Sequence, residues 1–142
     1  MILFCDTSAL LKLYLVEPGS AELKQYVQIA DAVAVCRIAW AEAHAAFARR
    51  VREVPKDADL IEQAKAALAQ DWPRLIVLDI DQTLVELAGD YADAFALRGY
   101  DSVQLAAAMR IHQVAGVPVS FAGYDLRLNK AAKMLGLSIF PA

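Results

Sequence analysis

The chain contains few of the residues on which several common classes of protein depend. It has only two cysteines in 142 residues, Cys5 and Cys36, and neither belongs to a CxxC pair. Isolated cysteines in apolar runs are more often small core residues than a disulfide or a metal site. The two histidines, His44 and His112, both fall within helical patterns, and for them we favour neutral or solvent-facing roles over catalysis.

Long hydrophobic runs and linkers are also missing. No apolar run approaches the about 20 residues that a membrane helix requires, and the start "MILFCDTSAL" has no basic region before its apolar residues. We therefore expect no signal peptide, no membrane segment and a cytoplasmic protein. No Gly/Ser-rich linker, repeat or low-complexity stretch divides the sequence. We expect residues 1–142 to form a single domain with a substantial core.

Positive charge is not in excess either. The formal net charge of −3 argues against broad, sequence-independent DNA binding, although it permits a local basic patch beside an acidic pocket. The hydrophobic fraction is 58%, which is high and suits parallel strands buried on both faces. It is also consistent with an apolar surface for a partner.

Short apolar runs alternate with longer segments of helical periodicity. The runs typical of strands are residues 2–5, 32–36, 75–79, 117–121 and 137–140. The periodic segments are residues 8–15, 20–30, 38–53, 56–71, 82–97, 101–115 and 125–135. Gly99 is expected to end the helix before it. This alternation predicts a three-layer α/β/α domain with a central parallel sheet of about five strands.

Acidic residues stand where predicted strands give way to helices. Asp6 follows the first strand directly, Glu42 lies early in the helix after the second, and Asp101 and Asp125 begin later helices. Ligands of open parallel sheets bind outside the carboxyl ends of the strands. Asp101 and Asp125 are also good helix starters, whereas Asp6 has little structural reason to be there, because burying a carboxylate without a partner is costly.

Four stretches together resemble a known family. They are "ILFCDTSALLKLYLVEPGSAEL", "RIAWAEAHAAFARR", "LRGYDSVQLAAAM" and "SFAGYDLRLNKAAKMLGLSIF". In this order, and over nearly the whole chain, they resemble the PIN-domain ribonucleases, specifically the VapC-type toxins of toxin–antitoxin pairs. The resemblance implies a PIN-like fold and an endoribonuclease that hydrolyses RNA phosphodiester bonds. It also implies neutralisation by a small VapB-type antitoxin and assembly as a homodimer.

The resemblance also implies roles for individual residues. Asp6, Glu42, Asp101 and Asp125 match the family's catalytic acids, which hold Mg²⁺ or Mn²⁺ and the attacking water, and Ser8 matches a supporting polar residue near the metal. The physical chemistry agrees, because four carboxylates in one pocket repel each other unless a cation neutralises them. Mg²⁺ prefers oxygen ligands and can activate a bound water. Such hydrolysis needs no histidine.

Residues that contact RNA are harder to assign. Arg37 and Arg98 are our candidates for phosphate contacts, because each neighbours one of the proposed acids in the sequence. A single exposed arginine more often only keeps a surface solvated. Trp40 could stack on a base, but on an apolar helix a tryptophan more often belongs to the core or to a partner interface.

Two other interpretations stay open. The stretch "LIVLDIDQTLVEL", residues 75–87, resembles the nucleophile motif of haloacid-dehalogenase-type phosphatases, with Asp79 as the nucleophile. That motif normally follows the first core strand rather than the third, and a short motif without its context is weak support. We expect instead a strand followed by a helix that Asp81 or Thr83 caps. The remaining alternative is a PIN-fold binding module without catalysis.

Overall fold

A central parallel sheet organises the protein. The structure is a computed structural model that describes residues 1–142, and its five strands are ordered β3-β2-β1-β4-β5. The strands are β1 (Ile2–Cys5), β2 (Ala32–Cys36), β3 (Ile76–Leu78), β4 (Val119–Ala122) and β5 (Ser138–Phe140). Phe4 in β1 lies opposite Ala34 on one side and Phe121 on the other. The first strand of the chain is therefore the central one.

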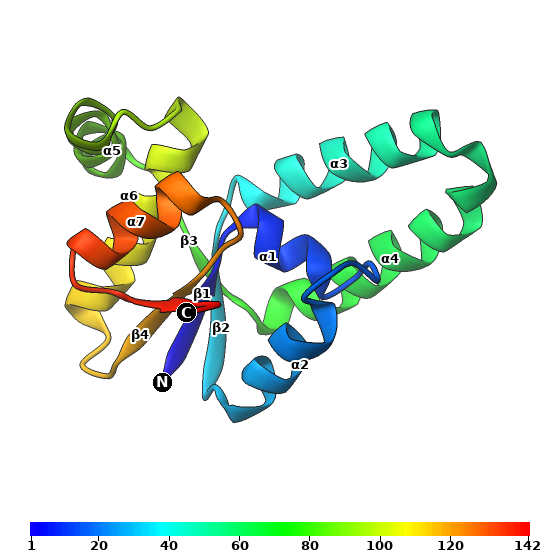
Figure 1. The fold of residues 1–142 in the computed structure, drawn as a ribbon, viewed down its shortest axis with the longest axis horizontal. Helices are drawn as coiled ribbons and strands as arrows, with labels where there is room; N and C mark the ends of the chain where they lie inside the picture. Colours follow the sequence, from blue (N-terminus) through cyan, green and yellow to red (C-terminus); the bar gives the residue numbers. More distant parts are fainter.

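Helices cover both faces of this sheet. They are α1 (Thr7–Lys12), α2 (Ser20–Ile29), α3 (Ala39–Glu53), α4 (Ala58–Asp71), α5 (Gln82–Phe95), α6 (Gly99–Val114) and α7 (Leu126–Met134), with short 3₁₀ turns at Pro55–Asp57 and Trp72–Arg74. Figure 1 shows α1 to α4 on one side of the sheet and α5 to α7 on the other. The predicted three-layer α/β/α architecture is confirmed.

The sheet separates two hydrophobic cores. Side chains of a strand point alternately to its two faces, so Leu3 packs with the α1 to α4 layer while Phe4 packs with the α5 to α7 layer. Cys5 and Cys36 are both buried and free, as expected. Because both faces of the central strands are covered, their carboxyl ends are held rigidly by packing on either side.

The connection between α5 and α6 differs from the expectation. Gly99 does not end a helix, because α5 already ends at Phe95 and Ala96 takes the left-handed conformation, with φ of 53°. Gly99 is instead the first residue of α6, and Arg98 is its N-cap. The chain therefore turns earlier than predicted, and Asp101 lies in the first turn of α6.

Helices α3 and α4 extend beyond the sheet. Figure 1 shows them as a pair that projects from the body, joined by the turn at Pro55–Asp57. The proline suits the first turn of such a segment, because its missing N–H would be unpaired there in any case. No helix combines the length and apolar character that crossing a bilayer demands.

Candidate active site

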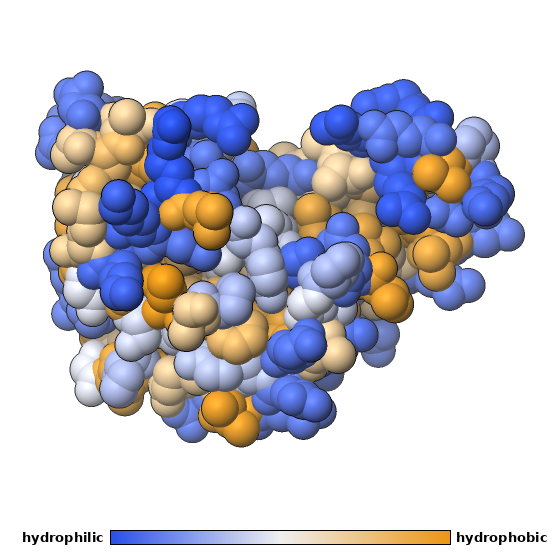
Figure 2. All heavy atoms as spheres, in the orientation of Figure 1, coloured by the Kyte–Doolittle hydropathy of each residue, from blue (hydrophilic) through white to orange (hydrophobic).

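Four acidic residues lie at the carboxyl edge of the sheet. Asp6 directly follows β1, Glu42 is in the first turn of α3, Asp101 is in the first turn of α6 and Asp125 is the N-cap of α7. Figure 2 shows the surface hollowed at this edge, between the α5 side and the projecting α3–α4 pair. Neighbouring strands β2, β1 and β4 lead into three of these positions, so the sheet order itself brings them together.

Asp6 is the most buried of these acids, with 4% of its surface exposed. Its Oδ1 caps α1, accepting hydrogen bonds from the Ser8 hydroxyl at 2.6 Å and from the Ala9 N–H at 2.9 Å. Burial raises the pKa of Asp6 to about 6, and the charges of Asp101 and Glu42 add to this rise, while the two hydrogen bonds oppose it. The second oxygen, Oδ2, receives no hydrogen bond from the protein.

The loop after β4 is tied to Asp6 through Ser8 and Gly123. The Ser8 hydroxyl oxygen accepts a hydrogen bond from the Tyr124 N–H at 3.1 Å, so one side chain links α1 to this loop. A Cβ on Gly123 would lie 2.8 Å from Asp6 Oδ2 and 2.9 Å from Asn129 Oδ1. Side-chain oxygens therefore occupy the space that any larger residue would need.

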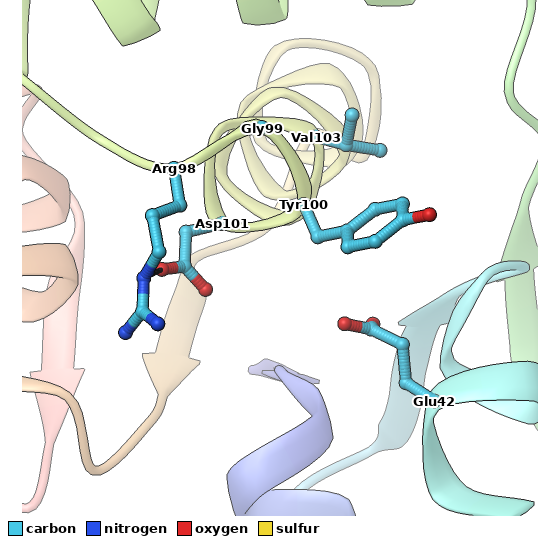
Figure 3. A pocket seen from close by; sticks show the side chains of 6 residues that line it. All are labelled: Glu42, Arg98, Gly99, Tyr100, Asp101 and Val103. Carbon is cyan, nitrogen blue, oxygen red and sulfur yellow. Dashed lines mark ion pairs between the residues drawn. The ribbon is translucent and has the colours of Figure 1, made fainter. Parts of the chain in front are cut away.

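Glu42 is held by two polar side chains from other elements. Its Oε1 accepts hydrogen bonds from the Thr7 hydroxyl and from Gln104 Nε2, each at 2.7 Å. Gln104 Nε2 also donates to Thr7 Oγ1 at 3.1 Å. Figure 3 shows the Glu42 carboxylate directed toward the first turn of α6, where Asp101 lies. The Oε2 atom of Glu42 has no protein donor.

Asp101 and Asp125 form the other side of the site. Burial raises the pKa of Asp101, the charge of Asp125 raises it further, and Arg98 opposes both effects. The Arg98 Nε lies 3.6 Å from Asp101 Oδ2. Asp125 Oδ1 accepts the Leu128 N–H at 2.9 Å, as expected of a helix N-cap, and this bond leaves its Oδ2 free.

Two adjoining cavities open beside the acids. One, of about 610 Å³, is lined by Glu42, Arg98, Gly99, Tyr100, Asp101 and Val103 (Figure 3). The other, of about 530 Å³, is lined by Arg98, Asp101, Tyr124, Asp125, Leu126 and Arg127. Asp101 and Arg98 are common to both. Tyr100, 65% exposed, offers an aromatic face beside the carboxylates.

The two arginines proposed for RNA contacts lie in different surroundings. Arg98 is at the mouth of the cavities, and its side chain is 86% exposed. Arg37 pairs with Asp79 and lines a separate pocket with Trp40 and Trp72. The structure therefore places Arg98, but not Arg37, beside the acids.

The residues of the phosphatase-like motif are already neutralised by arginines. Asp79 pairs with Arg37. Asp81 accepts two hydrogen bonds from Arg110, at 2.8 and 3.2 Å, and its Oδ1 caps α5 through the Leu84 N–H at 2.9 Å. The hydrogen bond with Arg110 holds the pKa of Asp81 below its usual range. The prediction that Asp81 or Thr83 caps this helix is confirmed for Asp81.

The oxygen atoms of the site suit a hydrated hard cation. No three acidic, histidine or cysteine side chains stand close enough to hold a metal ion by themselves. Asp6, Glu42 and Asp125 each engage one carboxylate oxygen and leave the other free, and Asn129 Oδ1 is buried without a partner. Mg²⁺ typically keeps several waters and takes few carboxylates, so this oxygen-only donor set fits it.

Several residues of the site escape reasoning from sequence. Thr7 stands inside the "DTS" stretch, so its place beside the first acid could have suggested a role. Gln104, Gly123 and Asn129 carry no such signal, because their contacts join segments far apart in the chain: Thr7 and Gln104, for example, are 97 positions apart. Tyr100 differs from an ordinary surface tyrosine only once the cavity beside it is known.

Solved structures with the same fold include toxin–antitoxin complexes. VapBC2 from Rickettsia felis, bound to a promoter DNA fragment, aligns with a TM-score of 0.65 at 13% identity over 98% of this chain and 97% of that chain. VapBC-1 from nontypeable Haemophilus influenzae aligns with a TM-score of 0.62 at 14% identity, over 98% and 96% of the two chains. At these identities the likeness shows the shared fold.

Comparison of sequences is more specific. The PIN domain profile matches residues 3–132. Ribonuclease VapC45 of Mycobacterium tuberculosis is 32% identical over 99% of this chain and 96% of its own length. Ribonuclease VapC46 of the same species is 31% identical over 96% of this chain and 95% of its own length. Together with the acids at the sheet edge, these matches show that the chain belongs to the PIN domain family and, within it, to the VapC-type ribonucleases.

Proposed function

We propose that this protein is a metal-dependent endoribonuclease, the toxin of a VapBC-type toxin–antitoxin pair. The observation that carries the proposal is the convergence of Asp6, Glu42, Asp101 and Asp125 at one sheet edge, where exposed Arg98 is the only cation paired with any of them. Full-length similarity to VapC ribonucleases supports the same activity.

Mg²⁺ is the proposed cofactor, with Mn²⁺ as an alternative. Asp6 and Asp101 would hold it, with Glu42 and Asp125 as further ligands or as partners of its waters. When bound, such an ion lowers the pKa of a bound water and stabilises the charge that develops on the phosphate. The protein's own contribution is orientation: Ser8 and the Ala9 N–H fix Asp6, so its free oxygen needs little reorganisation during the reaction.

RNA is the proposed substrate, and we expect it to lie along the two cavities beside the acids. Arg98 is our first candidate for a phosphate contact, since it stands at the cavity mouth beside Asp101. Tyr100 is a candidate to stack on an unpaired base, as exposed aromatic residues do in many single-stranded RNA sites. Arg37, which already pairs with Asp79, is the weaker candidate.

We propose that the protein binds an antitoxin, forms a homodimer and acts in the cytoplasm. Structural neighbours include Neisseria gonorrhoeae FitAcB and a Klebsiella pneumoniae toxin–antitoxin complex, and a VapB-type antitoxin is the partner expected for this chain. A homodimer is also expected, and size-exclusion chromatography coupled to light scattering would measure the mass directly. We expect both assemblies in the cytoplasm.

The decisive experiment measures metal-dependent cleavage of RNA. Antitoxin-free protein is incubated with total RNA in Mg²⁺, in Mn²⁺ and in EDTA, beside the variants Asp6→Asn and Asp101→Asn. We expect cleavage with metal, none in EDTA and none with either variant. Cleavage that persists in both variants would contradict the assignment, and absence of cleavage under all conditions would favour a non-catalytic binding module.

A phosphatase assay tests the other alternative. Release of phosphate from a phosphomonoester such as p-nitrophenyl phosphate is measured for the wild type, Asp79→Asn and Asp6→Asn. We expect no turnover that depends on Asp79, because Arg37 already neutralises it. Turnover lost in Asp79→Asn and kept in Asp6→Asn would replace the nuclease by a phosphatase.

A further inference from the structure

Gln104 is a buried amide with an unusual set of contacts. It lies one turn after Asp101 in α6, and only 2% of its surface is exposed. Its Nε2 donates to Glu42 Oε1 at 2.7 Å and to Thr7 Oγ1 at 3.1 Å. Both N–H groups of the amide are therefore engaged, one on a proposed metal ligand and one on the hydroxyl beside it.

These acceptors fix the orientation of the amide. The opposite orientation would place the Gln104 oxygen against the Glu42 carboxylate, where two acceptors would repel each other. In the observed orientation Gln104 Oε1 is buried and has no hydrogen-bond partner. The NH₂ group thus faces Glu42 although this leaves the amide oxygen unsatisfied.

An unpaired buried oxygen destabilises the fold. A methionine has nearly the same length and would fill this place in an apolar helix without leaving a polar atom unpaired. Stability alone therefore does not explain a glutamine here. Buried polar atoms without a partner tend to occur at functional sites, and the hydrogen bonds of this amide go only to Thr7 and Glu42.

Thr7 completes the arrangement from a third element. It follows Asp6 directly and is the first residue of α1, and its hydroxyl donates to Glu42 Oε1 at 2.7 Å while accepting from Gln104. Residues of α1, α3 and α6 therefore meet at one carboxylate oxygen. Both donors bind Oε1, which leaves Glu42 Oε2 free at the cavity that Asp101 also lines (Figure 3).

We propose that Thr7 and Gln104 form a clamp that positions Glu42. The clamp restrains the carboxylate of a long side chain so that one oxygen stays bound and the other is presented to metal and substrate. Without it, Glu42 would occupy several rotamers, and the site would lose the preorganisation on which such catalysis depends. The inference rests on the proposed ribonuclease function, and it assigns to both residues a role exerted through Glu42.

The first test compares steady-state RNA cleavage among single variants. Gln104→Met and Thr7→Val remove the donors at similar volume, and Thr7→Ser keeps the hydroxyl. Ser102→Ala is the matched control, because Ser102 is also 2% exposed in α6 but donates only to the Gly99 carbonyl at 2.7 Å. We expect kcat to fall about 10- to 100-fold in Gln104→Met and Thr7→Val, as for the loss of hydrogen bonds to a charged group, with KM for RNA nearly unchanged. Thr7→Ser should restore most of the rate.

A double-mutant cycle separates positioning from a general effect on structure. In a Glu42→Ala background the clamp has nothing to hold, so adding Gln104→Met should change the residual rate less than about twofold, in contrast to its effect on the wild type. Equal losses in both backgrounds, or an equal loss in Ser102→Ala, would overturn the proposal. If Gln104→Met fails to fold, Thr7→Val against Thr7→Ser gives the same comparison.

A readout independent of RNA cleavage distinguishes failure of the clamp from failure of the proposed function. Mn²⁺ affinity is measured by electron paramagnetic resonance on the wild type, Gln104→Met, Thr7→Val and Ser102→Ala. We expect weaker binding, by about tenfold as for other residues that orient metal ligands, in the first two variants only. A wild type that cleaves no RNA would refute the ribonuclease, whereas unchanged Mn²⁺ affinity in both clamp variants would refute the clamp.

Discussion

Two pairs of aspartates show how differently one residue type behaves in two places of this molecule. Asp79 and Asp81 stand at the exposed end of β3, and each is paired with an arginine. Asp6 directly follows the central strand β1 and Asp101 lies in the first turn of α6, and burial raises the pKa of both. Each carboxylate of the first pair has an arginine partner, whereas in the second pair Asp6 has none and Asp101 has only the exposed Arg98, 3.6 Å away.

This difference distinguishes the proposed site from its scaffold better than the sequence motif does. The motif "DID" is the more conspicuous feature of the sequence, yet Arg110 and the Leu84 N–H already use the oxygens of Asp81. Carboxylates at Asp6, Glu42 and Asp125 keep one oxygen unbound. Acids without a countercharge at the carboxyl edge of the sheet are therefore the better indication of function.

The sharpest contrast should appear in catalysis. Asp6→Asn and Asp101→Asn should each lower kcat for RNA cleavage by at least about 1000-fold, because loss of a proposed metal ligand would remove most of the stabilisation of the developing charge. Asp79→Asn and Asp81→Asn should stay within about threefold of the wild type, since their charges are already used by arginines. Cleavage of a fluorescent RNA at saturating Mg²⁺ measures all four, and equal losses in both pairs would erase the contrast.

A side chain at Gly123 should disturb Asp6 from the loop that follows β4. In Gly123→Ala the new Cβ would meet Asp6 Oδ2 at 2.8 Å and Asn129 Oδ1 at 2.9 Å, so both oxygens must move. We expect about a 100-fold loss of kcat and a loss of roughly 1–3 kcal/mol of unfolding free energy. Gly89→Ala in α5 is the control, because nothing lies within 4 Å of its Cβ position, and it should be active and no less stable.

Removing the charge of an aspartate should change the free energy of unfolding with opposite signs in the two regions. The pKa of Asp6 rises from 3.8 to about 6 on folding, so the folded state binds this proton more tightly than the unfolded chain. The stabilisation that comes from binding this proton is complete below the pKa of Asp6 in the unfolded chain. It is lost as the pH rises through about 6, the pKa in the folded state. In EDTA at pH 8, the free energy of unfolding of Asp6→Asn should therefore exceed that of the wild type by up to about 3 kcal/mol. This difference should vanish near pH 4.

Asp81 gives the matched opposite case. Arg110 lowers the pKa of Asp81. The contribution of Asp81 to stability is therefore present at a pH above the usual pKa of an aspartate, and it is lost as the pH falls through the lowered pKa. Asp81→Asn should lower the free energy of unfolding at pH 8. Urea unfolding between pH 4 and pH 8 measures both variants, and a wild type more stable than Asp6→Asn at pH 8 without metal would contradict this account.

The smallest effect is expected at the arginines. Arg98→Ala should raise KM for RNA about 3- to 10-fold and flatten its dependence on salt, because one phosphate contact is lost. Arg37→Ala, whose partner is Asp79, should change KM less than twofold. Measuring KM of both variants from 50 to 200 mM salt compares the two arginines. A larger effect in Arg37→Ala would indicate that RNA binds near the Trp40 pocket instead.

The sequence predicts the elements well, and it locates the four acids at the sheet edge partly for the same reason. Apolar runs bounded by helical periodicity place each strand within about two residues of its observed bounds, as for residues 75–79 and the strand Ile76–Leu78. In a parallel sheet such runs also locate the carboxyl edge, which identifies Asp6 and Glu42. Gly99 misleads because Ala96, a residue with no usual preference for the left-handed region, ends α5 first.

What the sequence does not predict depends on contacts between distant segments. The bond from Gln104 to Glu42 spans 62 residues, and the approach of Asn129 Oδ1 to Gly123 depends on how α7 packs against β4. Neither residue type, spacing nor periodicity encodes such a pair. The structure is needed to show that Glu42 has donors on one oxygen and none on the other.

The order of the strands also has a consequence for the protein in solution. Its two edge strands, β3 and β5, have only three residues each, while the longer strands lie between them. Beyond β5 the chain continues into Pro141, which has no N–H to offer a further strand. So little free backbone at the margins gives another chain almost no template for adding a strand. A protein this rich in apolar residues is thereby guarded against aggregation through its sheet edges.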